Sequence, residues 1–108
     1  MSVSVSIIVP CYNVAAYLDQ CMESLAGQSM EDIEIICVND GSSDHTAEIL
    51  REWRDRDGRV RVIDQKNSGV SAARNSGMEA AAGKYIGFVD PDDVVERNMF
   101  RRLFDAAV

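Results

Sequence analysis

The chain has 108 residues, 46% hydrophobic and 27% charged, which is the composition of one soluble globular domain. Its 18 acidic residues outnumber 11 basic ones, giving a net charge of -7 that excludes a nucleic-acid-binding surface. Any anionic ligand therefore needs local compensation from backbone N–H groups, a few placed cations or a metal ion.

The first apolar run, residues 3–10, is predicted to be a central strand that Pro10 closes, because proline cannot donate to a ladder. Asn13 is placed to cap a helix over residues 15–26, which has apolar side chains at helical spacing and ends at Gly27. No basic region precedes the strand, so the pattern is not that of a secretory signal. The three cysteines, an odd number without metal-ligand spacing, predict reduced thiols and a cytoplasmic protein.

A second buried strand is predicted over residues 34–39. The Gly- and Ser-containing turn at residues 40–44 follows, and Ser43 or Asp44 would cap a helix over residues 46–56. A weaker strand is expected over residues 60–64.

An Ala-rich helix is predicted over residues 70–82, although Gly77 within it disfavours helix, and Gly83 would stop it. A buried strand over residues 85–90 and a final helix over residues 96–106 complete the chain. This alternation predicts an α/β domain with a parallel sheet and helices on both faces. Because the last helix is apolar and uncapped, we expect the front part of a longer, truncated domain.

Three carboxylates, Asp90, Asp92 and Asp93, come directly after the strand that begins at Tyr85. Pro91 favours an extended Asp90, so the strand should stop there and leave the carboxylates at its carboxyl end. Charges this close repel one another unless a divalent cation offsets them. A solvated acidic turn or helix N-terminus explains the same residues equally well.

The loops after all four strands open on one edge of a parallel sheet, and they carry Asp, Asn or Tyr side chains suited to a polar ligand. None has the glycine pattern of a dinucleotide-binding or P-loop site. Arg74 follows the third loop and either points toward the carboxylates or forms a structural salt bridge with Glu79 or one of the aspartates.

Four sequence blocks resemble the inverting glycosyltransferases of family 2, in order and in spacing. The blocks are residues 6–13 (SIIVPCYN), 38–46 (VNDGSSDHT), 67–77 (NSGVSAARNSG) and 88–93 (FVDPDD). The resemblance implies a Rossmann-like GT-A three-layer sandwich, of which residues 1–108 are the nucleotide-sugar-binding half without the acceptor-binding half. It implies a nucleotide-sugar-binding set of Pro10, Tyr12, Asn13, Asp40, Asn67, Arg74 and Asp90.

Within that set the resemblance places Tyr12 near the base and has Asp40 accept a hydrogen bond from it, usually from N3 of uracil. Asp90-Pro91-Asp92 matches the DxD motif of the family. Asp92, shared with Asp93, would bind Mn²⁺ or Mg²⁺ on the diphosphate, and Asp90 would hold the ribose or a metal-bound water.

The function implied is metal-dependent transfer of a sugar, with inversion, from a nucleotide diphosphate such as uridine diphosphate (UDP) to a glycan or lipid-linked acceptor. The carboxylate that deprotonates the acceptor is expected beyond Val108, so the isolated chain should bind donor weakly and not transfer. The expected location is the cytoplasm, including the inner face of the membrane through the region beyond Val108, and a homodimer is left open.

Two alternatives come from other classes. A sugar-1-phosphate nucleotidyltransferase would need a glycine-rich, basic loop after the first strand, and a non-catalytic Mg²⁺-binding signalling domain would need its acidic pair there. Residues 10–13 supply neither.

Overall fold

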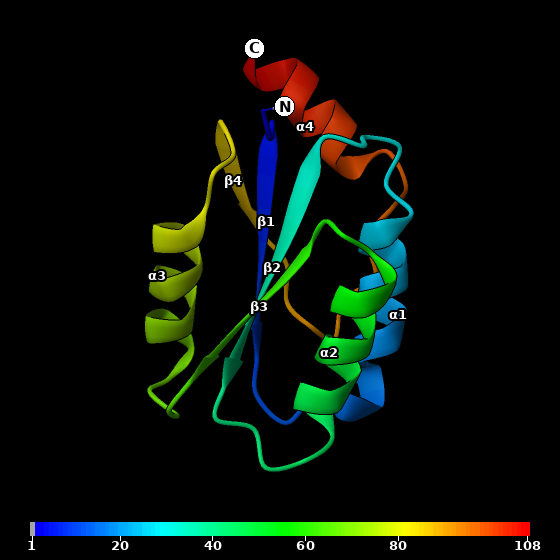
Figure 1. Ribbon diagram of the computed structural model, residues 1–108. Coiled ribbons are helices and arrows are strands. Elements are labelled where there is room, and N and C mark those ends of the chain that lie inside the picture. Colours follow the sequence, from blue (N-terminus) through cyan, green and yellow to red (C-terminus); the bar gives the residue numbers. More distant parts are fainter. Residues whose placement is uncertain (1) are drawn as a thin grey trace.

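The computed structural model describes residues 2–108, in which strands and helices alternate (Figure 1). The strands are β1 (Val5–Cys11), β2 (Ile33–Asp40), β3 (Val60–Gln65) and β4 (Tyr85–Phe88). The helices are α1 (Ala15–Ala26), α2 (Thr46–Arg56), α3 (Val70–Ala80) and α4 (Met99–Ala107). The predicted order of the elements is confirmed, and the bounds of α1 and α2 agree with the prediction.

The four strands form one parallel sheet in the order β3-β2-β1-β4. Helices α1 and α2 cover one face and α3 covers the other, while α4 lies near the amino ends of the strands (Figure 1). This is the predicted α/β sandwich of three layers. Because every strand runs the same way, all four loops that follow the strands leave from the same edge of the sheet, which we call the carboxyl edge.

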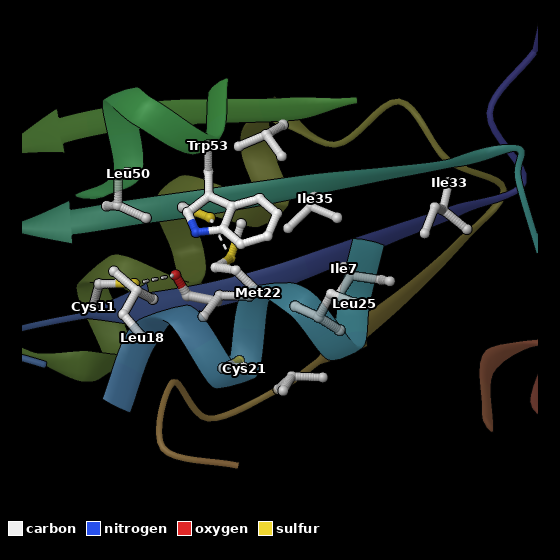
Figure 2. Close-up of a cluster of buried hydrophobic side chains, with 14 of the residues drawn as sticks. Ile7, Cys11, Leu18, Cys21, Met22, Leu25, Ile33, Ile35, Leu50 and Trp53 are labelled. Carbon is white, nitrogen blue, oxygen red and sulfur yellow. Dashed lines mark hydrogen bonds between the residues drawn. The ribbon is translucent and has the colours of Figure 1, made fainter. Parts of the chain in front are cut away.

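The larger part of the core lies between the sheet and the pair α1 and α2 (Figure 2). Alternate residues of β1, Ile7 and Val9, face this layer, as a strand with a period of two residues requires. They pack with Leu18 and Met22 of α1 and with Trp53 of α2, which is 4% exposed. Burial of these side chains fixes both helices on one face of the sheet.

A smaller apolar cluster lies under α3 and contains Ile8, Ile36, Val38 and Ala73. Here α3 approaches β1 so closely that a Cβ atom on Gly77 would lie 2.5 Å from Cγ2 of Ile8. The glycine that disfavoured a helix in the sequence is therefore a packing requirement of that helix.

Strand β1 does not end at Pro10, as predicted, but continues to Cys11. The carbonyl of Ile8 accepts a hydrogen bond from Val89 N–H, so the backbone of Ile8 faces β4. Two residues further along the strand, the backbone nitrogen of Pro10 faces the same side. Because β4 ends at Phe88, Pro10 lies where the ladder needs no donor on that side.

The prediction of a buried strand over residues 85–90 is wrong in two respects. Strand β4 ends at Phe88 and is an edge strand that pairs only with β1. Ile86 and Phe88 are 43% and 45% exposed, because α3 packs on β1 and β2 and leaves that face of β4 open.

Two helix bounds also differ from the prediction. Helix α3 ends at Ala80, and Gly83 does not stop it, because Ala82 N–H donates to the Glu34 carboxylate at 2.7 Å and Gly83 N–H donates to Ser6 Oγ at 2.8 Å. Helix α4 begins at Met99 instead of residue 96. Over residues 2–108, none of the helices has both the length and the apolar character needed to cross a membrane.

Candidate functional site

A cavity of about 310 Å³ opens at the carboxyl edge, between the loops that follow β1, β2 and β3. It lies within the size range of small-molecule sites. Its lining residues are Pro10, Cys11, Tyr12, Asp40, Asn67, Gly69, Val70 and Ala73. The walls are mainly apolar, and the Asp40 carboxylate is the one charged group among the described residues that line it.

The side chain of Asp40 is almost completely buried, with 3% exposure. Its Oδ1 atom accepts hydrogen bonds from Gln65 Nε2 at 2.9 Å and from Ser68 N–H at 2.8 Å, and its Oδ2 atom accepts one from Gly69 N–H at 2.9 Å. The bond from Gln65, together with those from the two backbone N–H groups, holds the pKa of Asp40 below its ordinary value against the opposing effect of burial. Asp40 is therefore an ionised acceptor at the N-terminus of α3.

This arrangement leaves Asp40 with acceptor capacity to spare. A carboxylate offers about four lone-pair positions, and donors from residues 2–108 use three of them. Two of the three are on Oδ1, so the remaining position is on Oδ2. One further N–H donor entering the cavity could bind there.

The backbone around Asp40 depends on two glycines with positive φ. Gly41 has φ +70°, and a Cβ atom on it would lie 2.6 Å from Asn67 N. Gly69 has φ +97° and turns the chain into α3. Asn67 closes the loop by donating from Nδ2 to the Asp40 carbonyl at 3.1 Å, so the loop of residues 66–69 folds over the end of β2.

Tyr12 is 52% exposed at the mouth of the cavity. Its aromatic ring is thus available for a planar ligand to stack on. Val70 and Ala73 of α3 line the cavity as well, and the small Ala73 side chain leaves space beside the sheet.

Asn13 does not cap α1, contrary to the prediction. The residue before the helix is Val14, without a side-chain cap, and Asn13 adopts φ 51°. Its Oδ1 atom accepts a hydrogen bond from Ser43 N–H at 2.8 Å, and its own N–H donates to Ser42 Oγ at 3.0 Å. Asn13 therefore ties the loop after β1 to the loop after β2 and does not line the cavity.

The predicted cap of α2, Ser43 or Asp44, is not its N-cap residue, which is His45 without a side-chain cap hydrogen bond. Asp44 nevertheless binds the start of the helix. Its Oδ1 atom accepts a hydrogen bond from Thr46 N–H at 2.9 Å, in the first turn of α2. Its Oδ2 atom accepts another from Ala15 N–H at 3.2 Å, at the start of α1. One carboxylate thus serves the N-termini of two adjacent helices, which fixes the carboxyl edge around the cavity.

The acidic stretch after β4 forms a turn closed by Asp93 N–H donating to the Asp90 carbonyl at 3.0 Å. The Arg74 guanidinium lies 3.7 Å from the Asp90 carboxylate, so Arg74 both points toward the carboxylates and forms a salt bridge with one of them. The turn lies against α1, where Cys21 Sγ donates to the Asp90 carbonyl at 3.7 Å. Burial, followed by the negative charges of Asp93, Asp92 and Asp90, raises the pKa of Cys21 to about 12.

The carboxylates of the acidic turn suit a divalent cation whose remaining ligands are oxygen atoms from outside the chain. Within residues 2–108, no three His, Cys, Asp or Glu side chains are grouped as a self-contained metal site. Asp90, Asp92 and Asp93 are nevertheless exposed carboxylates on one turn. Mg²⁺ in particular is commonly held by one or two carboxylates and completed by water and substrate phosphates. The residues therefore fit a cation bound together with a phosphate ligand.

The cavity brings together four of the predicted site residues: Pro10, Tyr12, Asp40 and Asn67. It does not include Asn13, Arg74, Asp90, Asp92 or Asp93 in its lining. Sequence reasoning missed the walls formed by Cys11, Gly69, Val70 and Ala73, and it missed Gln65 as a partner of Asp40. All four wall residues lie within the sequence blocks 6–13 and 67–77, which were the signal that could have indicated them.

Comparison with known proteins identifies the family. The model of "Glycosyl transferase family 2" matches residues 6–108. The chain is 54% identical over 103 residues to the uncharacterized glycosyltransferase EpsJ of Bacillus subtilis, covering 95% of this chain and 30% of EpsJ. It is 43% identical to the glycosyltransferase GlyA of Streptococcus pneumoniae, covering 96% of this chain and 15% of GlyA. The chain thus spans less than a third of these relatives.

Solved structures share the fold. Residues 1–349 of Staphylococcus aureus TarS, in complex with UDP, superpose with a TM-score of 0.85 at 32% identity, over 96% of this chain and 31% of that one. The mannosyltransferase PcManGT of Pyrobaculum calidifontis, in complex with GDP-Man and Mn²⁺, superposes with a TM-score of 0.84 at 22% identity, over 99% of this chain and 32% of that one. The chain has the GT-A fold and belongs to glycosyltransferase family 2.

Proposed function

We propose that this chain binds the nucleotide-sugar donor of a family 2 glycosyltransferase, with UDP as the nucleotide and a divalent cation on its diphosphate. The observation that carries the proposal is the cavity in which Tyr12, Asp40 and Asn67 converge, each at or just after the end of a different strand. The solved structures of TarS in complex with UDP and with UDP-GlcNAc support the choice of nucleotide; their sequence identities to this chain are 32% and 33%.

The uracil ring fits the chemistry of the cavity. It is a flat ring with one N–H donor, at N3, between two carbonyl groups. The open position on Asp40 Oδ2 accepts one such donor, and the exposed ring of Tyr12 offers a stacking surface. We therefore assign the base to the cavity, with Pro10 and Asn67 beside it.

The diphosphate would then extend toward the acidic turn after β4. Arg74, with its guanidinium 3.7 Å from Asp90, is the cation placed to offset charge there. We assign the metal to Asp92 and Asp93, and the ribose or a metal-bound water to Asp90. A divalent cation bound there would act as a Lewis acid on the charge that develops as the sugar–phosphate bond breaks.

The proposal gives this chain donor and metal binding within a reaction that transfers a sugar, with inversion, to a glycan or lipid-linked acceptor. Residues 1–108 act in it as the donor-binding half. Inversion requires a base that deprotonates the acceptor hydroxyl, and we assign that role to none of these residues. We therefore expect the chain alone to bind donor without turnover.

Calorimetric titration tests the proposal. UDP should bind more tightly in the presence of Mn²⁺ than in its absence, and Mn²⁺ alone should bind weakly because the turn lacks the remaining ligands. Asp92→Asn should remove the effect of Mn²⁺ on UDP binding. Uridine monophosphate, which lacks the second phosphate, should show a smaller effect of Mn²⁺.

Asp55→Asn is the matched control, since Asp55 is an exposed aspartate on α2. It should leave both titrations unchanged. Equal affinity for UDP and adenosine diphosphate, or UDP binding that is indifferent to Mn²⁺, would overturn the proposal.

A further inference from the structure

Two residues outside the cavity hold Asp40 in place. Gln65, the last residue of β3, donates from Nε2 to Asp40 Oδ1 at 2.9 Å. Ser76, on α3, donates from Oγ to Gln65 Oε1 at 2.6 Å. Neither residue belongs to the cavity lining among residues 2–108, so neither would touch a ligand bound there.

The hydrogen bonds that run from Ser76 to Gln65 and from Gln65 to Asp40, which we call the relay, have a defined direction. The side chains of Ser76 and Gln65 are both half-buried. If the Gln65 amide were reversed, Oε1 would face the Asp40 carboxylate, and two acceptors would lie at hydrogen-bond distance without a proton between them. The ionised Asp40 carboxylate therefore fixes the amide in one orientation, with Oε1 toward the Ser76 hydroxyl, which also lies 3.1 Å from the Ala72 carbonyl.

This orientation decides which lone pair of Asp40 stays open. Gln65 and Ser68 N–H together occupy Oδ1, whereas Oδ2 accepts only from Gly69 N–H within the described chain. Without the Gln65 amide, Oδ1 would also have an open position, and only the Ser68 and Gly69 N–H groups would hold the carboxylate. The relay thus reduces Asp40 to a single acceptor with a fixed direction.

We propose that Gln65 and Ser76 are positioning residues that set base selectivity, by making Asp40 present one fixed acceptor to the ring N–H of the nucleotide. The inference rests on the proposed function and deepens it. Uracil carries a proton at the ring nitrogen of that edge, whereas cytosine and adenine carry a lone pair, which a fixed carboxylate repels. Asp40 therefore selects a base with a ring N–H, and the relay increases this selectivity.

The test is a comparison of two ligands on each protein variant, with UDP and N3-methyl-UDP as probes. Wild-type chain should prefer UDP. In Gln65→Met, which is similar in length but donates no hydrogen bond, that preference should shrink by about tenfold, the value of one hydrogen bond to a charged group. Ser76→Ala should shrink it less, because Gln65 remains. Gln20→Met, at an exposed position on α1, is the matched control and should keep the wild-type ratio.

The ratio separates positioning from a merely structural role. If Gln65→Met weakens UDP and N3-methyl-UDP binding equally, Gln65 only supports the loop and the inference is overturned while the proposed function stands. If wild-type chain binds both probes equally well, Asp40 does not read the base, and the proposed function fails together with the inference. Should Gln65→Met fail to fold, Ser76→Ala decides by the same ratio.

Discussion

Replacing Asp40 by Asn is the most informative single change at the carboxyl edge. The substitution keeps the size and shape of the side chain but exchanges one acceptor oxygen for an NH₂ group. Three donors converge on the carboxylate, from Gln65, Ser68 and Gly69. Whichever way the new amide turns, its NH₂ group must face at least one of them.

The magnitude follows from the two possible orientations. With NH₂ at the Oδ1 position, two donors lose their acceptor, whereas with NH₂ at the Oδ2 position only Gly69 N–H does. The second orientation therefore costs less, and leaving one buried donor unsatisfied costs about 1–3 kcal/mol. The two surviving bonds lose their charge assistance, so we expect a total near 2–4 kcal/mol. A domain with roughly 5–15 kcal/mol of stability would still fold.

The same orientation turns the open position on Oδ2 from an acceptor into a donor. Asp40→Asn should therefore also lose its preference for UDP over N3-methyl-UDP. Denaturant unfolding and calorimetric titration measure the two effects separately. A variant within about 0.5 kcal/mol of wild type, the spread of ordinary surface substitutions, would refute the role of Asp40 as the anchor of the loop of residues 66–69.

Three further predictions concern stability and reactivity. Gly77→Ala should lower the free energy of unfolding by about 1–3 kcal/mol, because the added methyl group would lie 2.5 Å from an Ile8 side-chain atom. Burial by itself raises the pKa of Glu34, but hydrogen bonds from Ser6 and other donors hold it below its ordinary value of 4.5. The stability that Glu34 contributes should therefore be lost as pH falls below about 4.5. Unfolding at a series of pH values measures this loss. Burial raises the pKa of both Cys11 and Cys21 to about 12, so folded protein should resist thiol reagents at pH 8.

Each of these predictions has its own control. Gly58→Ala should leave stability nearly unchanged, because a Cβ atom there meets nothing within 4 Å. Glu34→Gln should flatten the acid limb of the stability profile, and an unchanged limb would mean that other carboxylates cause it. All three cysteines, which are buried and free, should react in denaturant. Rapid labelling of the folded chain would contradict the burial of the thiols.

The framework of the fold was predictable because each layer leaves a periodic pattern in the sequence. Alternation in β1 and helical spacing in α1 are local, and parallel strands necessarily place the following loops on one edge. That geometry alone was enough to bring Tyr12, Asp40 and Asn67 to one cavity. Family resemblance supplied their expected roles.

What the sequence could not indicate depends on contacts between distant segments. Exposure of Ile86 and Phe88 follows from the edge position of β4, which local hydrophobicity does not encode. Asn13 has the residue type of a helix cap, but its side-chain oxygen accepts a hydrogen bond from Ser43 N–H on another loop instead. Gln65 lies outside the four family blocks and Ser76 lies within one of them, but only the folded chain shows that both act on Asp40.

The central claim is that several loops at one edge of the sheet bind one nucleoside diphosphate. A crystal structure of the chain with UDP and Mn²⁺ tests it most directly. We predict uracil in the cavity beside Tyr12, with its N3 atom about 2.7–3.2 Å from Asp40 Oδ2, and the cation between the diphosphate and Asp92. A nucleotide bound elsewhere, or one whose base points away from Asp40, would contradict it.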